Sequence, residues 1–326
     1  MSEQKNNKKI RKIGNKIGWG ILIYNIILFV IVFIDMFVRL LTKSIKENTE
    51  DMSDEAFEVI FNEVMDEVLL SGTSSIIAVT IGVLFLILFF MKNLKFKQMW
   101  SVNKNMNKAD FFKLLSVFMA GQLFFSLIAM GMEKGLNLIG YTSMEEMATA
   151  TEVSSTVSMF LYAGIIGPIA EEIVYRGFVM NILKPYGKHF AIVCSAIIFG
   201  IMHANIHQIF FAILVGLVLG YVAMEYSLKW AVALHIFNNC IFGDVFSYLT
   251  AGFSENVQEI LVWVVQIIFF IIAAIVMYKQ RKEVKEYFIN NKEDKRKYRQ
   301  LFLNIGMIAF MVIHFALAID GITKLK

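Results

Sequence analysis

Long uncharged apolar runs limit most strongly what this chain can fold into. Ile17–Ile34 holds eighteen residues without a charge, and similar runs recur along the sequence. A helix needs about 20 such residues to cross the hydrocarbon core of a bilayer. Only helices and closed barrels satisfy their backbone hydrogen bonds in lipid, and runs of this length are helical. The sequence therefore predicts an all-α, polytopic bundle of transmembrane helices.

Composition supports this prediction and suggests how the chain is organised. Hydrophobic residues make up 57% of the chain and charged residues 18%, whereas soluble domains are about one quarter charged. Residues 1–16 carry six Lys or Arg residues. The apolar run that follows is too long for a secretory signal and has no small-residue cleavage site. We predict a basic cytoplasmic tail over 1–16 and one membrane domain over 17–326.

A hydropathy window of about 19 residues predicts nine spans, with eight as the alternative. The connections between residues 190 and 249 are very short, so the boundaries there are the least well defined. The nine spans are Ile17–Leu41, Ser74–Met91, Phe111–Met130, Met159–Lys184, Phe190–Ile209, Phe210–Tyr226, Trp230–Leu249, Ile260–Tyr278 and Leu301–Asp320.

The charges of the loops predict the orientation. The N-terminal tail, the loop with five lysines between Lys92 and Lys108, and the connection Lys279–Arg299 are basic. The stretches Glu47–Glu67, with nine carboxylates, and Glu133–Glu152 are acidic. Basic loops stay on the cytoplasmic side, so nine spans with a cytoplasmic N-terminus fit every loop.

One segment outside the spans has helical periodicity. In Asp54–Leu70, apolar residues recur at helical spacing with acidic residues between them. This pattern predicts an amphipathic helix that lies on the outer surface or covers the bundle.

Ionisable residues inside the spans are costly and need a reason. Glu172 and Arg176 are four positions apart, so they share a helix face and can pair. Glu171 lies about 100° away around the helix and lacks that arginine. We interpret Glu171 as the carboxylate available for chemistry; a purely structural charge cluster is the alternative.

Two further motifs bring histidine and asparagine into the same third of the chain. FGIMH ends in His203, and HIFNN carries His235 and Asn239 four positions apart. A single histidine in a bundle is more often a packing residue than a catalytic one. With Glu171, however, these side chains fall near the middle of neighbouring spans, so a common polar cavity is possible.

Such a set can support hydrolysis in two ways. A carboxylate and a histidine can draw a proton from water, while another imidazole and an amide stabilise the oxyanion. Alternatively Glu171, His203 and His235 could bind Zn²⁺ and leave its fourth position for water. The residue types do not choose between these mechanisms. The sequence has neither an H-E-x-x-H helix nor a G-x-S-x-G elbow.

At these residues the sequence resembles the CPBP family, which groups type II CAAX prenyl endopeptidases with bacteriocin-processing and bacteriocin-immunity proteins. The family's E-E-x-x-x-R, F-x-x-x-H and H-x-x-x-N motifs all occur in order, within a core of about residues 153–250. The matching residues are Glu171, Glu172, Arg176, Phe199, His203, His235 and Asn239.

The resemblance implies an endopeptidase of the membrane, in the plasma membrane of a bacterium. It implies that Glu171 is the general base and His203 helps to activate the water. His235 and Asn239 would hold the oxyanion, with Glu172, Arg176 and Phe199 as supporting residues. We expect either no cofactor or Zn²⁺. The expected partners are the lipid bilayer and a membrane-embedded, lipidated or leader-bearing peptide or a membrane protein, with no nucleic acid.

Two other classes of function stay open. A bacteriocin-immunity protein or membrane scaffold could use the same fold without catalysis, although it would not need a free glutamate in mid-membrane. A transporter could use Glu171 and the histidines as a proton relay. That class predicts inverted repeats with broken helices, and the sequence has none.

Overall fold

The computed structural model describes residues 3–46, 53–94 and 96–325. The regular secondary structure of these residues is helical, apart from the paired strands β1 (Tyr141–Thr142) and β2 (Thr323–Lys324). The predicted all-α class is therefore confirmed. Predictions that concern residues 1–2, the acidic stretch 47–52 and Lys95 fall outside the described ranges.

The helices follow one another with short connections. Before the motif region they are α1 (Glu3–Lys46), α2 (Asp54–Leu70), α3 (Gly72–Phe90), α4 (Phe96–Met99), α5 (Lys108–Asn137) and α6 (Met144–Ala150). The motif region holds α7 (Val157–Leu161), η2 (Tyr162–Ile166), α8 (Gly167–Glu172), η3 (Ile173–Met180), α9 (Asn181–Leu183), η4 (Lys184–Tyr186), α10 (Lys188–Met202), α11 (Ile206–Glu225), α12 (Leu228–Ile236), η5 (Phe237–Val245) and α13 (Phe246–Thr250). The last helices are α14 (Glu255–Lys279), α15 (Arg281–Asn290), α16 (Lys295–Phe302) and α17 (Ile305–Asp320).

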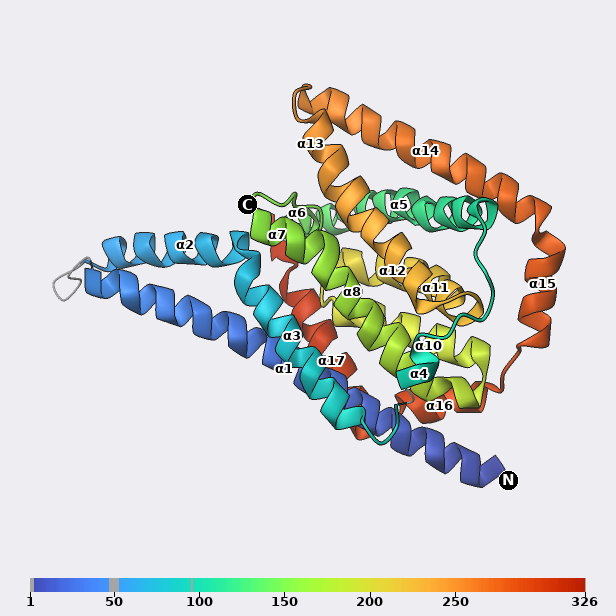
Figure 1. Ribbon diagram of the computed structural model, residues 1–326. Helices are drawn as coiled ribbons and strands as arrows, with labels where there is room; N and C mark the ends of the chain where they lie inside the picture. The colour runs from blue at the N-terminus through green and yellow to red at the C-terminus, as the bar shows by residue number, and fades with distance from the viewer. Residues whose placement is uncertain (1–2, 47–52, 95, 326) are drawn as a thin grey trace.

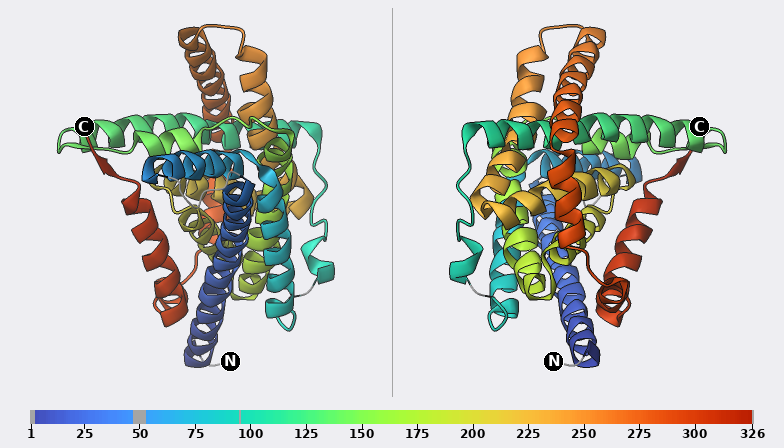
Figure 2. Two further views of the ribbon diagram at one scale, coloured as in Figure 1. Left: turned by 90° about the vertical axis from the view of Figure 1, so that its left-hand side faces the viewer. Right: turned by 90° about the vertical axis from the view of Figure 1, so that its right-hand side faces the viewer.

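The motif-bearing helices lie at the centre of the bundle. Figure 1 shows α8, α10, α11 and α12 between two flanking groups of helices. On one side α1 packs against α3 and α17, and on the other α5 packs against α14 and α11. The two views of Figure 2 show the same arrangement, with α1 and α17 converging near the N-terminus. The flanking helices therefore shield a core built from the motif region.

Several helices are long and apolar enough to cross a membrane, which indicates an integral membrane protein. Among the described residues there are six, in α1, α3, α5, residues 157–186, α11 and α14, or up to seven if the bent pair α16–α17 is one span. Two of the nine predicted spans are not among these helices. α10 has only 15 residues, which rise about 22 Å, and the helix from α12 to α13 carries Asn238, Asn239 and Asp244, which lower its mean hydropathy. The count of nine spans stays a prediction.

The amphipathic helix predicted over Asp54–Leu70 is confirmed as α2. Its buried residues Ile60, Val64 and Val68 pack on the last third of α1, against Val32, Met36 and Leu40. The 44 residues of α1 rise about 66 Å, far more than the thickness of a hydrocarbon core. Figure 1 shows the end of α1 and α2 projecting from the bundle as a hairpin.

The break predicted between Ile209 and Phe210 is wrong. The chain turns earlier, at His203–Asn205, between α10 and α11. Ala204 adopts a left-handed conformation with φ of 49°, and the Asn205 side chain caps α11 by accepting hydrogen bonds from the His207 and Gln208 amides. The turn contains neither glycine nor proline, the residues that commonly mark a helix end. The sequence therefore did not show where the chain turns.

Three stretches of the motif region are π-helical. They are η2 and η3, on either side of α8, and η5, which follows α12. A π-helical turn is wider than an α-helical turn, and such turns occur mostly as single bulges, often at functional sites. They alter which side chains share a helix face after Tyr162 and after Ile236.

Candidate active site

The paired glutamates lie on α8 and differ in surroundings. Glu172 is fully buried, and its Oε1 accepts a hydrogen bond of 2.8 Å from Arg176 Nη1. The Glu171 side chain is 24% exposed and has no arginine or lysine partner among the described residues. The pair that the four-residue spacing predicted is therefore present, and the neighbouring carboxylate is the accessible one.

Two groups outside its own helix hold Arg176. Its guanidinium lies 4.3 Å from the centre of the Phe199 ring, a cation–π contact, and its Nη2 donates 3.3 Å to the carbonyl oxygen of Gly216 on α11. A Cβ atom at Gly216 would lie 3.2 Å from both Arg176 Nη2 and Ala196. A side chain here would press on α10 and the arginine, which favours glycine where α10, α11 and Arg176 meet.

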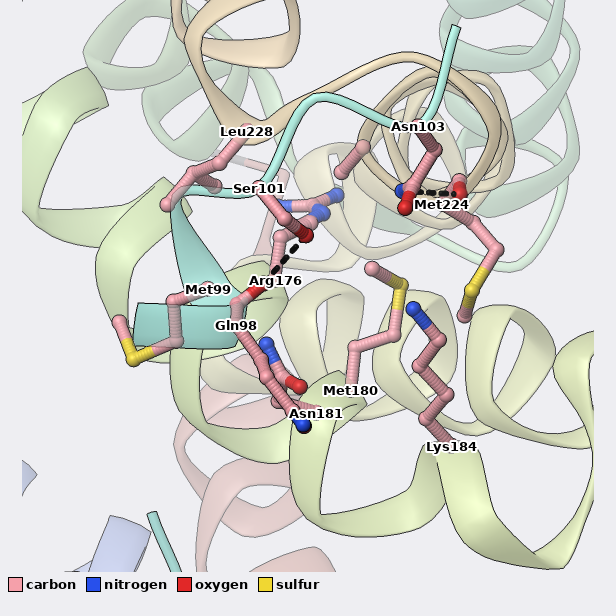
Figure 3. Close-up of a pocket in the computed structure, with 11 residues that line it drawn as sticks. Gln98, Met99, Ser101, Asn103, Arg176, Met180, Asn181, Lys184, Met224 and Leu228 are labelled. Carbon is pink, nitrogen blue, oxygen red and sulfur yellow. Dashed lines mark hydrogen bonds between the residues drawn. The ribbon is translucent and has the colours of Figure 1, made fainter. Parts of the chain in front are cut away.

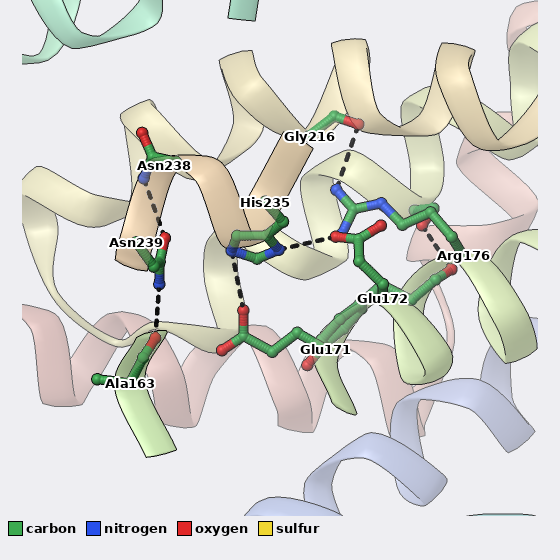
Figure 4. Close-up of polar contacts among 10 residues, drawn as sticks. Ala163, Glu171, Glu172, Arg176, Gly216, His235, Asn238 and Asn239 are labelled. Atoms are coloured by element: carbon green, nitrogen blue, oxygen red, sulfur yellow. Dashed lines mark hydrogen bonds and ion pairs between the residues drawn. The ribbon is translucent and has the colours of Figure 1, made fainter. Parts of the chain in front are cut away.

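His235 lies between the two carboxylates. Its Nδ1 is 3.0 Å from Glu172 Oε1, and its Nε2 is 3.6 Å from Glu171 Oε2 (Figure 4). The imidazole, which is 6% exposed, thus bridges the structural pair and the accessible glutamate. Because Glu172 already binds Arg176 as a carboxylate, which can only accept, we infer that His235 Nδ1 carries the proton.

Phe199 joins the two histidines. Its ring makes edge-on contacts with His203, at 5.1 Å between ring centres, and with His235, at 5.9 Å. His203 caps the C-terminal end of α10, at the turn described above. The phenylalanine of the F-x-x-x-H motif therefore packs against both imidazoles and the arginine. None of the hydrogen bonds found in the described ranges involves the His203 ring, so packing alone positions it.

Asn239 binds the backbone of the glutamate helix. Its Nδ2 donates 3.1 Å to the carbonyl oxygen of Ala163 in η2 (Figure 4). In an α-helix the Gly167 amide would donate to Ala163, but here it donates to Tyr162. The next residue, Pro168, has no N–H. The Asn239 side chain therefore replaces a helix hydrogen bond that the π-helical turn removes.

Two polar residues that the sequence motifs did not single out continue this contact. The Asn238 side chain donates 3.0 Å to Asn239 Oδ1, and Gln122 Nε2 on α5 donates 2.6 Å to Asn238 Oδ1. Gln122 lies in the middle of an apolar span. A polar side chain at that depth is a signal that could have found it.

The comparisons with known proteins bear on this central region. Residues 153–241 match the family model described as type II CAAX prenyl endopeptidase Rce1-like. The family resemblance is thereby confirmed. No curated protein and no solved structure matches the chain. We call residues 153–241 the Rce1-like segment.

The Rce1-like segment contains every residue predicted for the site. Its boundaries enclose α7 to α12 and the first turn of η5, and therefore the glutamates, the arginine, Phe199, both histidines and Asn239. Gln122 lies outside it, on a flanking helix. The site thus combines the matched segment with at least one residue from the rest of the bundle.

A small cavity lies beside Arg176, between the Rce1-like segment and the residues around α4. It measures about 20 Å³ and is bordered by Gln98, Ser101 and Asn103, from the α4 region, and by Arg176 and Lys184 (Figure 3). A space of this size holds about one water molecule. The buried Nε of Arg176 has no hydrogen-bond partner among the described residues, so an acceptor there would satisfy it.

The donor atoms do not fit a zinc site. In the described ranges no group of three His, Cys, Asp or Glu side chains is arranged to hold a metal ion. His235 directs Nδ1 at Glu172 and Nε2 at Glu171, so its two nitrogens face carboxylates. A set of Glu171, His203 and His235 would need these side chains to rearrange.

Proposed function

We propose that this protein is a membrane-embedded endopeptidase of the CAAX type. It hydrolyses a peptide bond in a membrane-embedded, lipidated or leader-bearing peptide. The observation that carries the proposal is the bridge that His235 makes between Glu171 and Glu172 inside the Rce1-like segment. A binding scaffold needs no accessible carboxylate beside a buried imidazole.

Glu171 is the general base in this proposal. Its carboxylate takes a proton from a water molecule, and the water oxygen attacks the carbonyl carbon of the scissile bond. The carbonyl oxygen becomes the oxyanion. The proton then passes to the leaving amide nitrogen as the carbon–nitrogen bond breaks. Glu171 is partly exposed and pairs with no arginine of the described ranges, which supports this role over one for Glu172.

His235 stabilises charge next to the base. Glu172 accepts from Nδ1, so Nε2 is the nitrogen that faces Glu171 and the reacting groups. When it carries a proton, Nε2 can donate to the oxyanion. His203, across the Phe199 ring, assists with the water, and the second N–H of the Asn239 amide is a further donor to the oxyanion.

The proposed setting is the plasma membrane of a bacterium, with a cytoplasmic N-terminus. The basic and acidic loops support the orientation. α10 begins at Lys188 and rises about 22 Å, so a start at the cytoplasmic interface leaves His203 within the depth of the bilayer. The partners are the bilayer and a peptide or membrane-protein substrate.

A comparison of membrane and secreted peptides tests the function. Cells with the wild-type protein should contain cleaved peptides that are missing with Glu171→Ala. Glu259→Ala, at an exposed position of α14, is the control and should retain them. A purified sample should cleave a fluorogenic farnesylated peptide that ends in a C-a-a-X sequence. Identical peptide sets from wild type and Glu171→Ala would refute the proposal.

A further inference from the structure

Three side-chain amides form a hydrogen-bonded chain from a flanking helix to the site. Gln122 on α5 donates 2.6 Å to Asn238, Asn238 donates 3.0 Å to Asn239, and Asn239 donates 3.1 Å to the Ala163 carbonyl oxygen. Asn238 is 9% exposed. Figure 4 shows the last two links beside His235 and Glu171. The chain therefore couples α5 to the proposed catalytic residues.

The chain has a direction, because each amide has one accepting oxygen and one donating nitrogen. Gln122 donates to Asn238 Oδ1, so the Nδ2 of Asn238 turns towards Asn239. Asn239 must then present its oxygen to Asn238 and its nitrogen to Ala163. The Gln122 donor therefore favours one orientation of Asn239 from two links away.

At the other end of the amide chain, the Ala163 carbonyl oxygen can only accept a hydrogen bond. The Ala163 carbonyl receives no hydrogen bond from Gly167, which donates to Tyr162, and Pro168 has no N–H to offer. An inverted Asn239 amide would bring two oxygens together here, which is unfavourable in a buried site. Both ends of the chain therefore favour the same orientation.

We propose that Gln122 is a positioning residue that holds the Asn239 amide with its nitrogen towards the reacting groups. The inference rests on the proposed function, in which the second N–H of Asn239 donates to the oxyanion. Without the Gln122 donor, Asn238 can rotate and present its oxygen to Asn239 Oδ1, and only the bond to Ala163 then opposes the exchange of oxygen and nitrogen in the Asn239 amide. An amide oxygen beside a developing oxyanion would repel it.

Kinetics on the purified full-length protein test the inference, with the fluorogenic farnesylated C-a-a-X peptide as probe. Gln122→Met keeps the side-chain length and removes the donor. We expect kcat to fall by about 10- to 100-fold with little change in KM, since misplacement of a catalytic group costs up to about 100-fold. Ser126→Ala is the matched control, because Ser126 lies one turn along α5 and bonds Gln266 on α14 instead. It should retain the wild-type kcat.

Gln122→Glu gives a readout that a packing role would not. A protonated carboxyl group can still donate to Asn238, whereas a carboxylate can only accept and so inverts the chain. We expect kcat of this variant to fall more steeply with rising pH than kcat of the wild type. Wild-type kcat in Gln122→Met, or a wild-type pH profile in Gln122→Glu, would overturn the inference.

A double variant separates this inference from the proposed function. Gln122→Met should slow Asn239→Ala no further, and the two losses of melting temperature should be less than additive. Independent, additive losses would overturn the chain. If the wild type cleaves no probe and its peptide set is identical to that of Glu171→Ala, the proposed function fails, and the melting cycle alone still decides whether Gln122 acts through Asn239.

Discussion

His235 and Glu172 are 63 positions apart in the sequence and form a buried hydrogen bond of 3.0 Å between Nδ1 and Oε1. The same carboxylate oxygen binds Arg176 at 2.8 Å. Glu172 therefore joins α8, η3 and α12 into one unit, and its neighbour Glu171 is brought beside the outer nitrogen of the imidazole. This relationship gives the two glutamates different expected responses to substitution.

Glu171→Gln should abolish turnover and leave the fold nearly unchanged, because no arginine among the described residues pairs with it. Glu172→Gln should lower stability as well, since it leaves Arg176 as an uncompensated buried charge. Breaking one side of a buried pair costs about 3–5 kcal/mol. Thermal melts of both purified variants in detergent measure the difference. Equal melting temperatures would mean that the roles are assigned wrongly.

The two histidines should also differ. His235→Ala should lower the melting temperature together with activity, because it removes a buried hydrogen bond to Glu172 worth about 1–3 kcal/mol when left unmade. His203→Ala should reduce activity with a smaller loss of stability, since that ring makes no hydrogen bond in the described part of the chain and packs against Phe199. Melting curves and initial rates of the two variants, measured side by side, check this. A more severe melting loss in His203→Ala would argue against the bridge.

Replacement of Asn239 should lower both the turnover and the stability of the protein. Asn239→Ala should slow turnover by about 100- to 1000-fold, the usual effect of losing one oxyanion donor. It should also destabilise the protein by about 1–3 kcal/mol, because the Ala163 carbonyl loses its donor.

Pro168→Ala tests the reason for that loss. Alanine restores an N–H in the first turn after η2, which can donate to the carbonyls freed there. In the Asn239→Ala background we expect part of the melting temperature to recover, with no recovery of turnover. Recovery of both would show that Asn239 acts only through the helix backbone.

Metal removal should leave turnover unchanged. The nitrogens of His235 face carboxylates, and the described part of the chain offers no three-ligand set for zinc. Elemental analysis of active protein, followed by assays after chelation, measures this directly. One zinc per chain, whose removal stops turnover and whose return restores it, would favour the alternative with Glu171, His203 and His235 as ligands.

Reporter fusions test the orientation. A reporter after Lys97, in α4, or after Lys285, in α15, should score cytoplasmic, and one near Glu63, in α2, should score external. Figure 1 shows α4 and α16 near the N-terminal end of the long α1 and α2 at its other end. An external signal at Lys285 would exclude the nine-span arrangement.

Several features of the protein were predictable because they depend on local sequence alone. Hydropathy predicted the helical class, and helical spacing predicted α2 and the Glu172–Arg176 pair. Both depend only on residues within one segment. The motif spacing also predicted the family resemblance of the central helices.

The turn at His203–Asn205 and the π-helical stretches were not predictable in this way. Ala204 carries no residue-type signal for a left-handed conformation, and the residue types in η2 and η5 do not distinguish a π-helical turn from an α-helical one. The π-helical turn η5 also changes the face on which Asn239 lies, so an argument from four-residue spacing did not predict its bond to Ala163.

The sequence by itself determined which residue types could carry chemistry, because charged and polar side chains in apolar helices are costly and therefore conspicuous. Only the tertiary structure decided their partners. His235 reaches both glutamates because α12 packs beside α8. Gln122 reaches Asn238 because α5 lies close to η5. Hydrogen bonds act over about 3 Å, so they depend on distances between helices that spacing along a single chain does not specify.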